Sequence, residues 1–372
     1  MSGLRTHILV LLLILASLPA VLAQDTAQGV TKILAEAKVL HDNARNKEDF
    51  SRALARYQDA VAVLDCSGSN EASALGLKAV AMHQIATLYY RLGQSQKALE
   101  TCKNSLAISR AVKARIGVFP LDIKVLMDMG HLYDTMGQQG KALEAYRESL
   151  ASVREVTKVT GDVMEEDGEI LGKIAVIHTH LGKYREGLGL YKEALPILRK
   201  TGDAKSEGWA LVGMGDCHEK LSQYQRALER FKESLPIMRK VGEVKGEALA
   251  LNKMAEMHCM LYQYQDALKL CQNSLDLWRK VGDTAGEIDA LTNMGSAYLG
   301  LRQPQKALKC WEESLALSRK IGAVNREALH LKQIGRLYEI MDQREKAREY
   351  RDKAREIRKK IKDTQGPRQR SE

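Results

Sequence analysis

One short pattern recurs along almost the whole chain and limits the folds open to it. Residues 263–283 read QYQDALKLCQNSLDLWRKVGD, and close variants stand forty residues before and forty residues after. Aligned on the alanine of KAL, RAL or DAL, the copies are marked by Ala53, Ala98, Ala142, Gly187, Ala227, Ala267, Ala307 and Ala347. Successive markers are 45, 44, 45, 40, 40, 40 and 40 residues apart. A period of this length predicts a solenoid of stacked repeats.

Small residues stand at two fixed places in each copy. Seven residues after the marker, the copies carry Ala60, Ser105, Ser149, Ala194, Ser234, Ser274, Ser314 and Ala354. Twelve residues before the marker, seven copies carry Ala or Gly, as at Gly215 and Gly295. A bulkier residue such as Tyr146 or Trp311 usually follows the marker by four. A spacing of four and then three places these side chains on one face of a helix.

These positions predict an all-α fold. The chain of 372 residues has only 6 prolines and 3 phenylalanines, while its most frequent residues include Ala, Leu, Lys, Glu and Arg, which favour helices. We expect each copy to form two antiparallel helices joined by a short turn. Because one pair cannot bury both of its faces, about eight pairs should stack into an α-solenoid.

Glycine, proline and short polar residues indicate where the helices end and begin. A glycine follows the second helix of five copies, which favours a left-handed C-cap at Gly161, Gly202, Gly242, Gly282 and Gly322. Asp162, Asp203 and Asp283 come directly after such glycines and are predicted to start the next helix. Ser222 is predicted as an N-cap, and Pro304 suits a first helical turn.

The two ends of the chain differ from the repeats. Residues 1–23 have a basic start, an apolar run over 8–18 and small residues before a cut at Gln24, the three parts of a secretory signal peptide. We expect the solenoid to span 24–362 and residues 363–372 to form a disordered basic tail. The protein would be secreted or exported, or cytoplasmic if the leader is not functional. The apolar run is shorter than the roughly 20 residues of a membrane span, so an anchor is expected only if the leader stays uncleaved.

No residue pattern points to a metal, a cofactor or a catalytic centre. His178, His218 and His258 occupy equivalent positions two helices apart. Packed helices lie about 8–10 Å apart, whereas zinc ligands converge within about 2 Å of one ion. The chain has no Gly-rich phosphate loop, HExxH motif or nucleophile elbow. We therefore expect no cofactor, no metal and no enzymatic activity, and we interpret the six cysteines, which include no CxxC pair, as mostly buried thiols.

A further repeated position holds an aromatic or imidazole side chain. Three residues after the first small position stand Tyr89, Tyr133, His178, His218, His258, Tyr298 and Tyr338. With the small and bulky positions, this series resembles the tetratricopeptide repeat family over roughly residues 30–360. The forty-residue register is similar to the subgroup of Pins-type adaptors and bacterial signalling arrays. The resemblance implies a right-handed superhelix whose first helices line a concave groove, and this groove would hold an extended peptide or a partner helix.

The resemblance also implies which residues face the groove. In the family these lie six, three and two before and one after the first small position. The candidate partner-binding residues are Lys173, Trp209, Asp216, Asn252, Lys253, Glu256, Asn293, Lys332 and Arg336. Polar groups at such positions can bond a peptide backbone or its acidic side chains. The Lys and Asn pattern of the family's carboxylate clamp, which binds chaperone tails, does not occur here.

Two functions fit these expectations. The first is a non-catalytic protein–protein interaction scaffold that binds a peptide or protein segment in the groove. The alternative is a regulatory array that senses a ligand or peptide within an enzyme or signalling complex. A net charge of +10 also raises nucleic acid as a partner. Its basic residues are spread, however, and groove positions include Asp128, Asp216 and Asp289, so we expect a protein or peptide partner instead.

Overall fold

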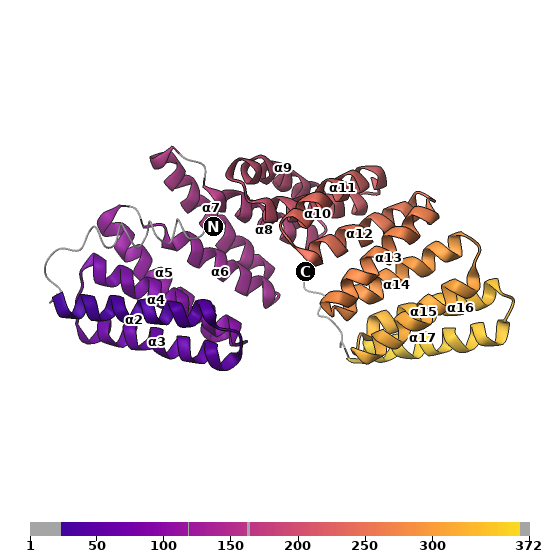
Figure 1. Cartoon of the computed structure of the whole chain (residues 1–372), viewed down its shortest axis with the longest axis horizontal. Coiled ribbons are helices and arrows are strands. Elements are labelled where there is room, and N and C mark those ends of the chain that lie inside the picture. The colour runs from indigo at the N-terminus through magenta and orange to yellow at the C-terminus, as the bar shows by residue number, and fades with distance from the viewer. Residues whose placement is uncertain (1–23, 118, 162–163, 365–372) are drawn as a thin grey trace. The chain divides into compact units, whose positions relative to one another are not determined.

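The computed structural model describes residues 24–117, 119–161 and 164–364 (Figure 1). Within these residues every regular element is a helix, from α2 to α17. The predicted signal peptide and residues 365–372 of the predicted tail lie outside the described residues. Helix α2 begins at Gln24, and α17 continues to Thr364, two residues into the segment predicted as tail.

The chain divides into two compact units, one ending at Leu181 and the other starting at Gly182. The first contains α2 (Gln24–Asn43), α3 (Lys47–Cys66), α4 (Ala72–Arg91), α5 (Ser95–Ile116), α6 (Leu121–Thr135), α7 (Gln139–Thr160) and α8 (Glu165–His180). The second contains α9 (Tyr184–Thr201), α10 (Ala204–Lys220), α11 (Tyr224–Lys240), α12 (Val244–Met260), α13 (Tyr264–Val281), α14 (Thr284–Gly300), α15 (Pro304–Lys320), α16 (Val324–Ile340) and α17 (Arg344–Thr364).

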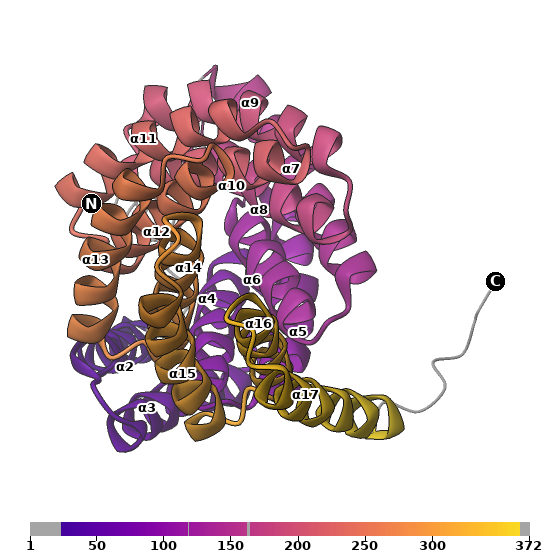
Figure 2. The ribbon, with the colours of Figure 1, turned by 90° about the vertical axis from the view of Figure 1, so that its right-hand side faces the viewer.

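Consecutive helices pack side by side within each unit. In the second unit α10 packs on α11, α12 on α13, α14 on α15 and α16 on α17, and each pair also contacts the next. Figure 2 shows α17 beside α16 at the C-terminal end of this stack. The predicted all-α array of antiparallel helix pairs is therefore confirmed.

The first helices of neighbouring pairs approach one another. Helix α4 contacts α6 in the first unit, and α12 contacts both α10 and α14 in the second. Among the described residues, no two second helices of neighbouring pairs contact each other to this extent. Each stack therefore bends toward its first helices. We call α10, α12, α14 and α16 the inner row of the second unit.

The first small position makes room for an aromatic ring of the same pair. A Cβ atom at Gly130, Gly215 or Gly295 would overlap the ring of Tyr146, Phe231 or Trp311. Where the second helix carries Cys102 or Cys271 instead, the first position is Ala86 or Ala255. The sequence pattern indicated close contact between helix backbones. The structure adds that a side chain of the second helix fills the space that a side chain would need at the glycine.

The second small position often carries serine because its hydroxyl ties the two helices of a pair together. Ser149 Oγ donates to the carbonyl of Ile123 at 2.8 Å, and Ser274 Oγ donates to that of Ala248 at 2.8 Å. Ser105 makes the same contact with Ala79 at 2.7 Å. All three serines are fully buried, so the hydrogen bond offsets the cost of removing a hydroxyl from water.

Most of the predicted helix boundaries are confirmed. The five C-terminal glycines all have positive φ, between 67° and 78°. Asp203 and Asp283 cap the following helices by accepting from the amides of Ser206 and Gly286, while Asp162 lies outside the described residues. Pro304 opens α15 as predicted.

The prediction for Ser222 is wrong. This residue adopts φ 58° in the turn, and Gln223 is the N-cap of α11. Its hydroxyl is therefore placed one residue too early to cap the helix, and the backbone there needs the left-handed conformation that glycine supplies in other copies.

The longer period of the first copies lengthens their second helices. Helices α5 and α7 each have 22 residues, whereas α11 has 17 and α13 has 18. All six cysteines are free thiols, and four of them are buried, as expected for small apolar core residues.

Candidate functional site

The nine candidate residues are divided between the two units. Lys173 lies on α8 of the first unit, where it is exposed. The other eight lie on the inner row of the second unit. Each unit is considered by itself, and the second unit carries the candidate site.

Three of the predicted residues meet in one charged cluster between α10 and α12. Lys253 Nζ lies 3.2 Å from Asp216 Oδ1 and 3.6 Å from Glu256 Oε2. Its shortest ion pair, 2.7 Å, is with Glu219 Oε2. We call Asp216, Glu219, Lys253 and Glu256 the α10–α12 charge cluster. Its lysine is 20% exposed and Glu219 only 8%, whereas Asp216 and Glu256 are 30% and 39% exposed, so the cluster is partly buried.

Burial and charge act against each other in this cluster. Burial alone would lower the pKa of Lys253, but the three surrounding carboxylates outweigh it and raise that pKa. For Asp216 and Glu256 burial is the larger effect, and the pKa of each carboxyl is raised. Burial also acts to raise the pKa of Glu219, yet Lys253 and Lys220 together bring it below its usual range. The lysine is thus firmly charged and joins two inner helices.

Two further contacts join neighbouring inner helices by polar groups. Asn293 Nδ2 donates to Asn252 Oδ1 at 3.0 Å, so α14 is tied to α12. Arg326 of α16 pairs with Asp289 of α14 at 3.1 Å. Asn252 is 5% exposed and thus belongs to the packing between helices. The two predicted asparagines are therefore hydrogen-bonded to each other.

The remaining predicted residues of the second unit are accessible. Trp209 on α10 is 36% exposed, an unusual position for the largest apolar side chain. Arg336 on α16 is exposed, and Lys332 on the same helix is half-buried. Together they give the inner row one aromatic and two basic groups that the charge cluster does not use.

Sequence reasoning missed several residues that hold these helices together. Glu219 makes the shortest bond to Lys253, and its only signal was its position three residues after Asp216 on the same helical face. In the first unit, His83 Nε2 lies 2.8 Å from Asp128 Oδ2, which links α4 with α6. Neither partner could be paired from sequence because 45 residues separate them.

The repeated histidines make structural contacts. His218 Nδ1 lies 2.7 Å from Gln223 Oε1, and His258 Nδ1 lies 2.6 Å from Gln263 Oε1. Each glutamine opens the second helix of the same pair. Within the described ranges, no group of three or more His, Cys, Asp or Glu side chains is arranged to hold a metal ion. In that same part of the chain, no helix is long and apolar enough to cross a membrane.

A family model and several solved structures match this architecture. The model, described as tetratricopeptide repeat, matches residues 77–155, 166–240, 246–320 and 287–360. A search of curated protein sequences gives no significant match.

Solved structures with a similar fold include the apo form of the quorum sensor NprR from B. thuringiensis. It has a TM-score of 0.64 and 15% identity, and the match covers 88% of this chain and 87% of that one. The apo form of RapI has a TM-score of 0.60 and 12% identity, with 76% and 98% covered. A Rap protein complexed with competence and sporulation factor has a TM-score of 0.54 and 13% identity, with 90% and 98% covered. At these identities the likeness establishes the fold alone.

Proposed function

Because the chain belongs to the tetratricopeptide repeat family, we propose that it is a non-catalytic interaction scaffold whose inner row binds a peptide or protein segment. The observation that carries this proposal is that the side chains of the inner row fall into two groups. Partly buried charges and paired asparagines fix the helices to one another, while Trp209, Lys332 and Arg336 remain accessible. Rigid helices that present a few uncommitted groups are suited to recognition, since their backbone is already ordered before a partner binds.

The accessible groups favour a segment with carboxylates and an apolar side chain. Arg336 and Lys332 can form charge-assisted hydrogen bonds with Asp, Glu or a terminal carboxylate. An exposed tryptophan offers a large contact area and is a frequent centre of binding energy. The ligand class therefore follows from the chemistry of these three side chains.

A double variant tests the proposal. Trp209→Ala with Arg336→Ala removes accessible groups and leaves the α10–α12 charge cluster intact. Capture of partners from the native source by the full chain should fall at least fivefold. Arg344→Ala with Arg348→Ala on α17 is the matched control, because these arginines are 90% and 85% exposed and lie outside the inner row. Equal recovery by both variants and the wild type would move the binding site away from the inner row.

Lys253 is a poor choice for that test. Its removal would leave three partly buried carboxylates of the charge cluster without their shared cation, which would weaken the contact between α10 and α12. A loss of binding could then reflect a loss of structure.

A regulatory array that senses a peptide is the second candidate. Its support is the fold shared with a quorum sensor and with a Rap protein complexed with competence and sporulation factor. Compaction of the full chain on adding a purified peptide partner, measured by solution X-ray scattering, would favour this candidate over a passive scaffold. An unchanged radius of gyration at saturation would favour the scaffold.

We also propose export of the protein, on the basis of the leader pattern in residues 1–23. N-terminal sequencing of the protein from its native source should start at Gln24. A start at Met1 would remove this argument.

A further inference from the structure

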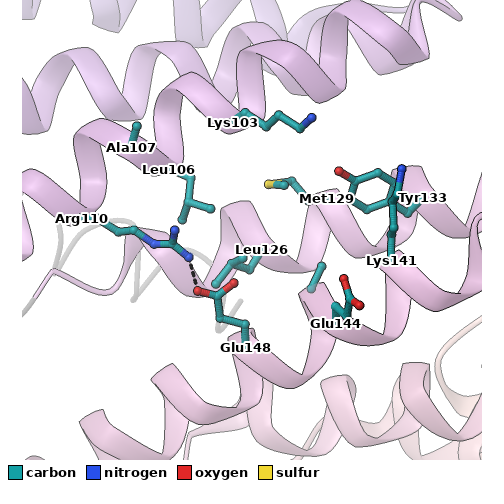
Figure 3. A pocket seen from close by; sticks show the side chains of 11 residues that line it. Lys103, Leu106, Ala107, Arg110, Leu126, Met129, Tyr133, Lys141, Glu144 and Glu148 are labelled. Atoms are coloured by element: carbon teal, nitrogen blue, oxygen red, sulfur yellow. Dashed lines mark hydrogen bonds and ion pairs between the residues drawn. The ribbon is translucent and has the colours of Figure 1, made fainter.

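A cleft of about 560 Å³ lies between α5 and α7 in the first unit. Its apolar lining includes Leu106, Leu126 and Met129 (Figure 3). Ala145 of α7 also lines the cleft. This volume is in the range of clefts that bind ligands. The cleft opens between two second helices, α5 and α7, and α6, the first helix between them in the chain, contributes Leu126, Met129 and Tyr133 to its lining.

The cleft exists where one side chain of the repeat is unusually small. Ala145 stands three residues after its marker alanine. The equivalent residues in the other copies are all larger: Arg56, Thr101, Leu190, Arg230, Leu270, Cys310 and Tyr350. Ala145 lines the cleft together with Ala107 of the facing helix, so the two short side chains leave its centre open.

The two ends of the cleft differ in charge. Arg110 and Glu148 form an ion pair across one end, as the dashed line in Figure 3 shows. The ammonium groups of Lys103 and Lys141 lie toward the other end. Lys141 also lies over the ring of Tyr133, with Nζ 5.7 Å from its centroid. Glu144 is the remaining charged residue of the lining, so three basic and two acidic groups leave a surplus of one positive charge.

We propose that this cleft is a second binding site, for a short acidic peptide segment that inserts one apolar side chain between α5 and α7. The apolar side chain would fill the space beside Ala107 and Ala145. Carboxylates next to it in the segment would pair with Lys103 and Lys141. A segment of a longer chain fits an open cleft because it can enter and leave along the surface, whereas an isolated small molecule would stay largely exposed to water.

Four fluorescein-labelled octapeptides test this proposal on the full chain. Each has acidic residues on both sides of one apolar residue, which is Leu, Ile, Met or Phe. At least one should bind saturably in fluorescence anisotropy, and replacing its apolar residue by serine should weaken binding at least tenfold. No saturable binding by any of the four peptides, or equal binding of the serine peptide, would overturn the proposal.

Ala145→Leu tests where the peptide binds and introduces a residue that other copies already carry at this position. Leucine occupies the equivalent position at Leu190 and Leu270, so the fold should be retained, which circular dichroism checks. The leucine should fill the cleft and weaken peptide binding at least tenfold. Unchanged affinity in a folded Ala145→Leu variant would show that the peptide binds elsewhere.

A matched pair of lysine variants tests the charge. Lys141→Gln should weaken binding several-fold, whereas Lys306→Gln should not. Lys306 is the right control because it lies over Tyr298 at 5.4 Å just as Lys141 lies over Tyr133. Equal effects of the two substitutions would remove the role of Lys141. Tighter binding of octanoate than of any peptide, lost in Ala145→Leu, would overturn the choice of a peptide as the ligand.

Discussion

At the scale of single residues, the closest packing occurs where a glycine meets an aromatic ring. Trp311 is 3% exposed, and its ring fills the space above Gly295. The indole Nε1 donates to the carbonyl of Thr292 at 3.2 Å, which fixes the ring in place. The space above Gly295 and the hydrogen bond to Thr292 therefore both hold the Trp311 ring. Displacing the ring from that space would also disturb the bond.

Gly295→Ala should destabilise the protein by about 1–3 kcal/mol, the usual cost of overpacking, because its methyl group displaces Trp311. Gly189→Ala is the matched control: Gly189 is an exposed residue of α9 whose Cβ would meet nothing within 4 Å. Alanine there should stabilise the helix by about 0.5–1 kcal/mol. Urea unfolding followed by circular dichroism measures both, and equal midpoints for the two variants would contradict the packing argument.

His330 adds a pH-dependent contribution at the same scale. It is 1% exposed and lies 2.9 Å from Thr292 Oγ1 and 3.0 Å from Ser314 Oγ. Burial, with a smaller effect of the Arg326 charge, lowers its pKa from 6.5 to about 4. The unfolded chain therefore binds the proton more readily than the folded one. The stabilisation is complete above pH 6.5 and is lost as the pH falls toward 4.

Between pH 7.5 and pH 5.0 this histidine should cost the wild type about 2 kcal/mol of unfolding free energy. Urea midpoints at the two pH values, compared with those of His330→Gln, measure this difference. The variant should lose less stability than the wild type over this interval. A parallel decline in both proteins would mean that His330 takes up no additional proton when the chain unfolds in this pH range.

At the scale of helices and turns, the same backbone conformation recurs with different residues. Five residues before the marker, the early copies use Gly93, Gly137 and Gly182, with φ between 73° and 77°. The later copies place Ser222, Tyr262, Arg302 and Asp342 there, with φ between 55° and 61°. Non-glycine residues in this region cost about 1–2 kcal/mol, so each later turn carries a backbone strain that the glycine turns avoid.

Ser222→Gly should therefore stabilise the second unit by about 1 kcal/mol, because glycine adopts the required φ without a Cβ penalty. Gly182→Ser is the reciprocal variant and should destabilise by a similar amount. Urea midpoints measure both. A stabilising effect of Gly182→Ser would show that the turn conformation does not set the preference.

Helix contacts also explain the alternation of tyrosine and histidine at one repeated position. In four copies a tyrosine lies under the lysine that precedes the marker, as Tyr298 lies under Lys306 at 5.4 Å. Two copies that lack this lysine have His218 or His258 bonded to a glutamine. Both arrangements tie the end of the first helix to the start of the second. The histidines thus make an alternative contact across the turn that joins the two helices.

At the scale of the molecule, contacts between helices are almost all between neighbours in the chain. In such arrays stability is close to a sum over repeats and their interfaces. The division after Leu181 leaves α9 to α17 with buried core clusters of their own.

Residues 182–372 expressed alone should remain helical and unfold cooperatively in a thermal melt followed by circular dichroism. The fragment should be less stable than the full chain, because it lacks the contribution of the preceding repeats. A broad, non-cooperative melt would show that the second unit depends on the first for folding.

The sequence by itself determined the helix pairs, their order and most of their ends, because period, small residues and capping glycines act locally. That the first helices line the inner side followed only from the family resemblance. Only the tertiary structure decided which groups in the inner row are free. Lys253 and Asn293 looked like ligand contacts, yet their partners lie 34 and 41 residues away. Pairing of charges and the opening beside Ala145 depend on distances between different helices, which a one-dimensional pattern does not contain.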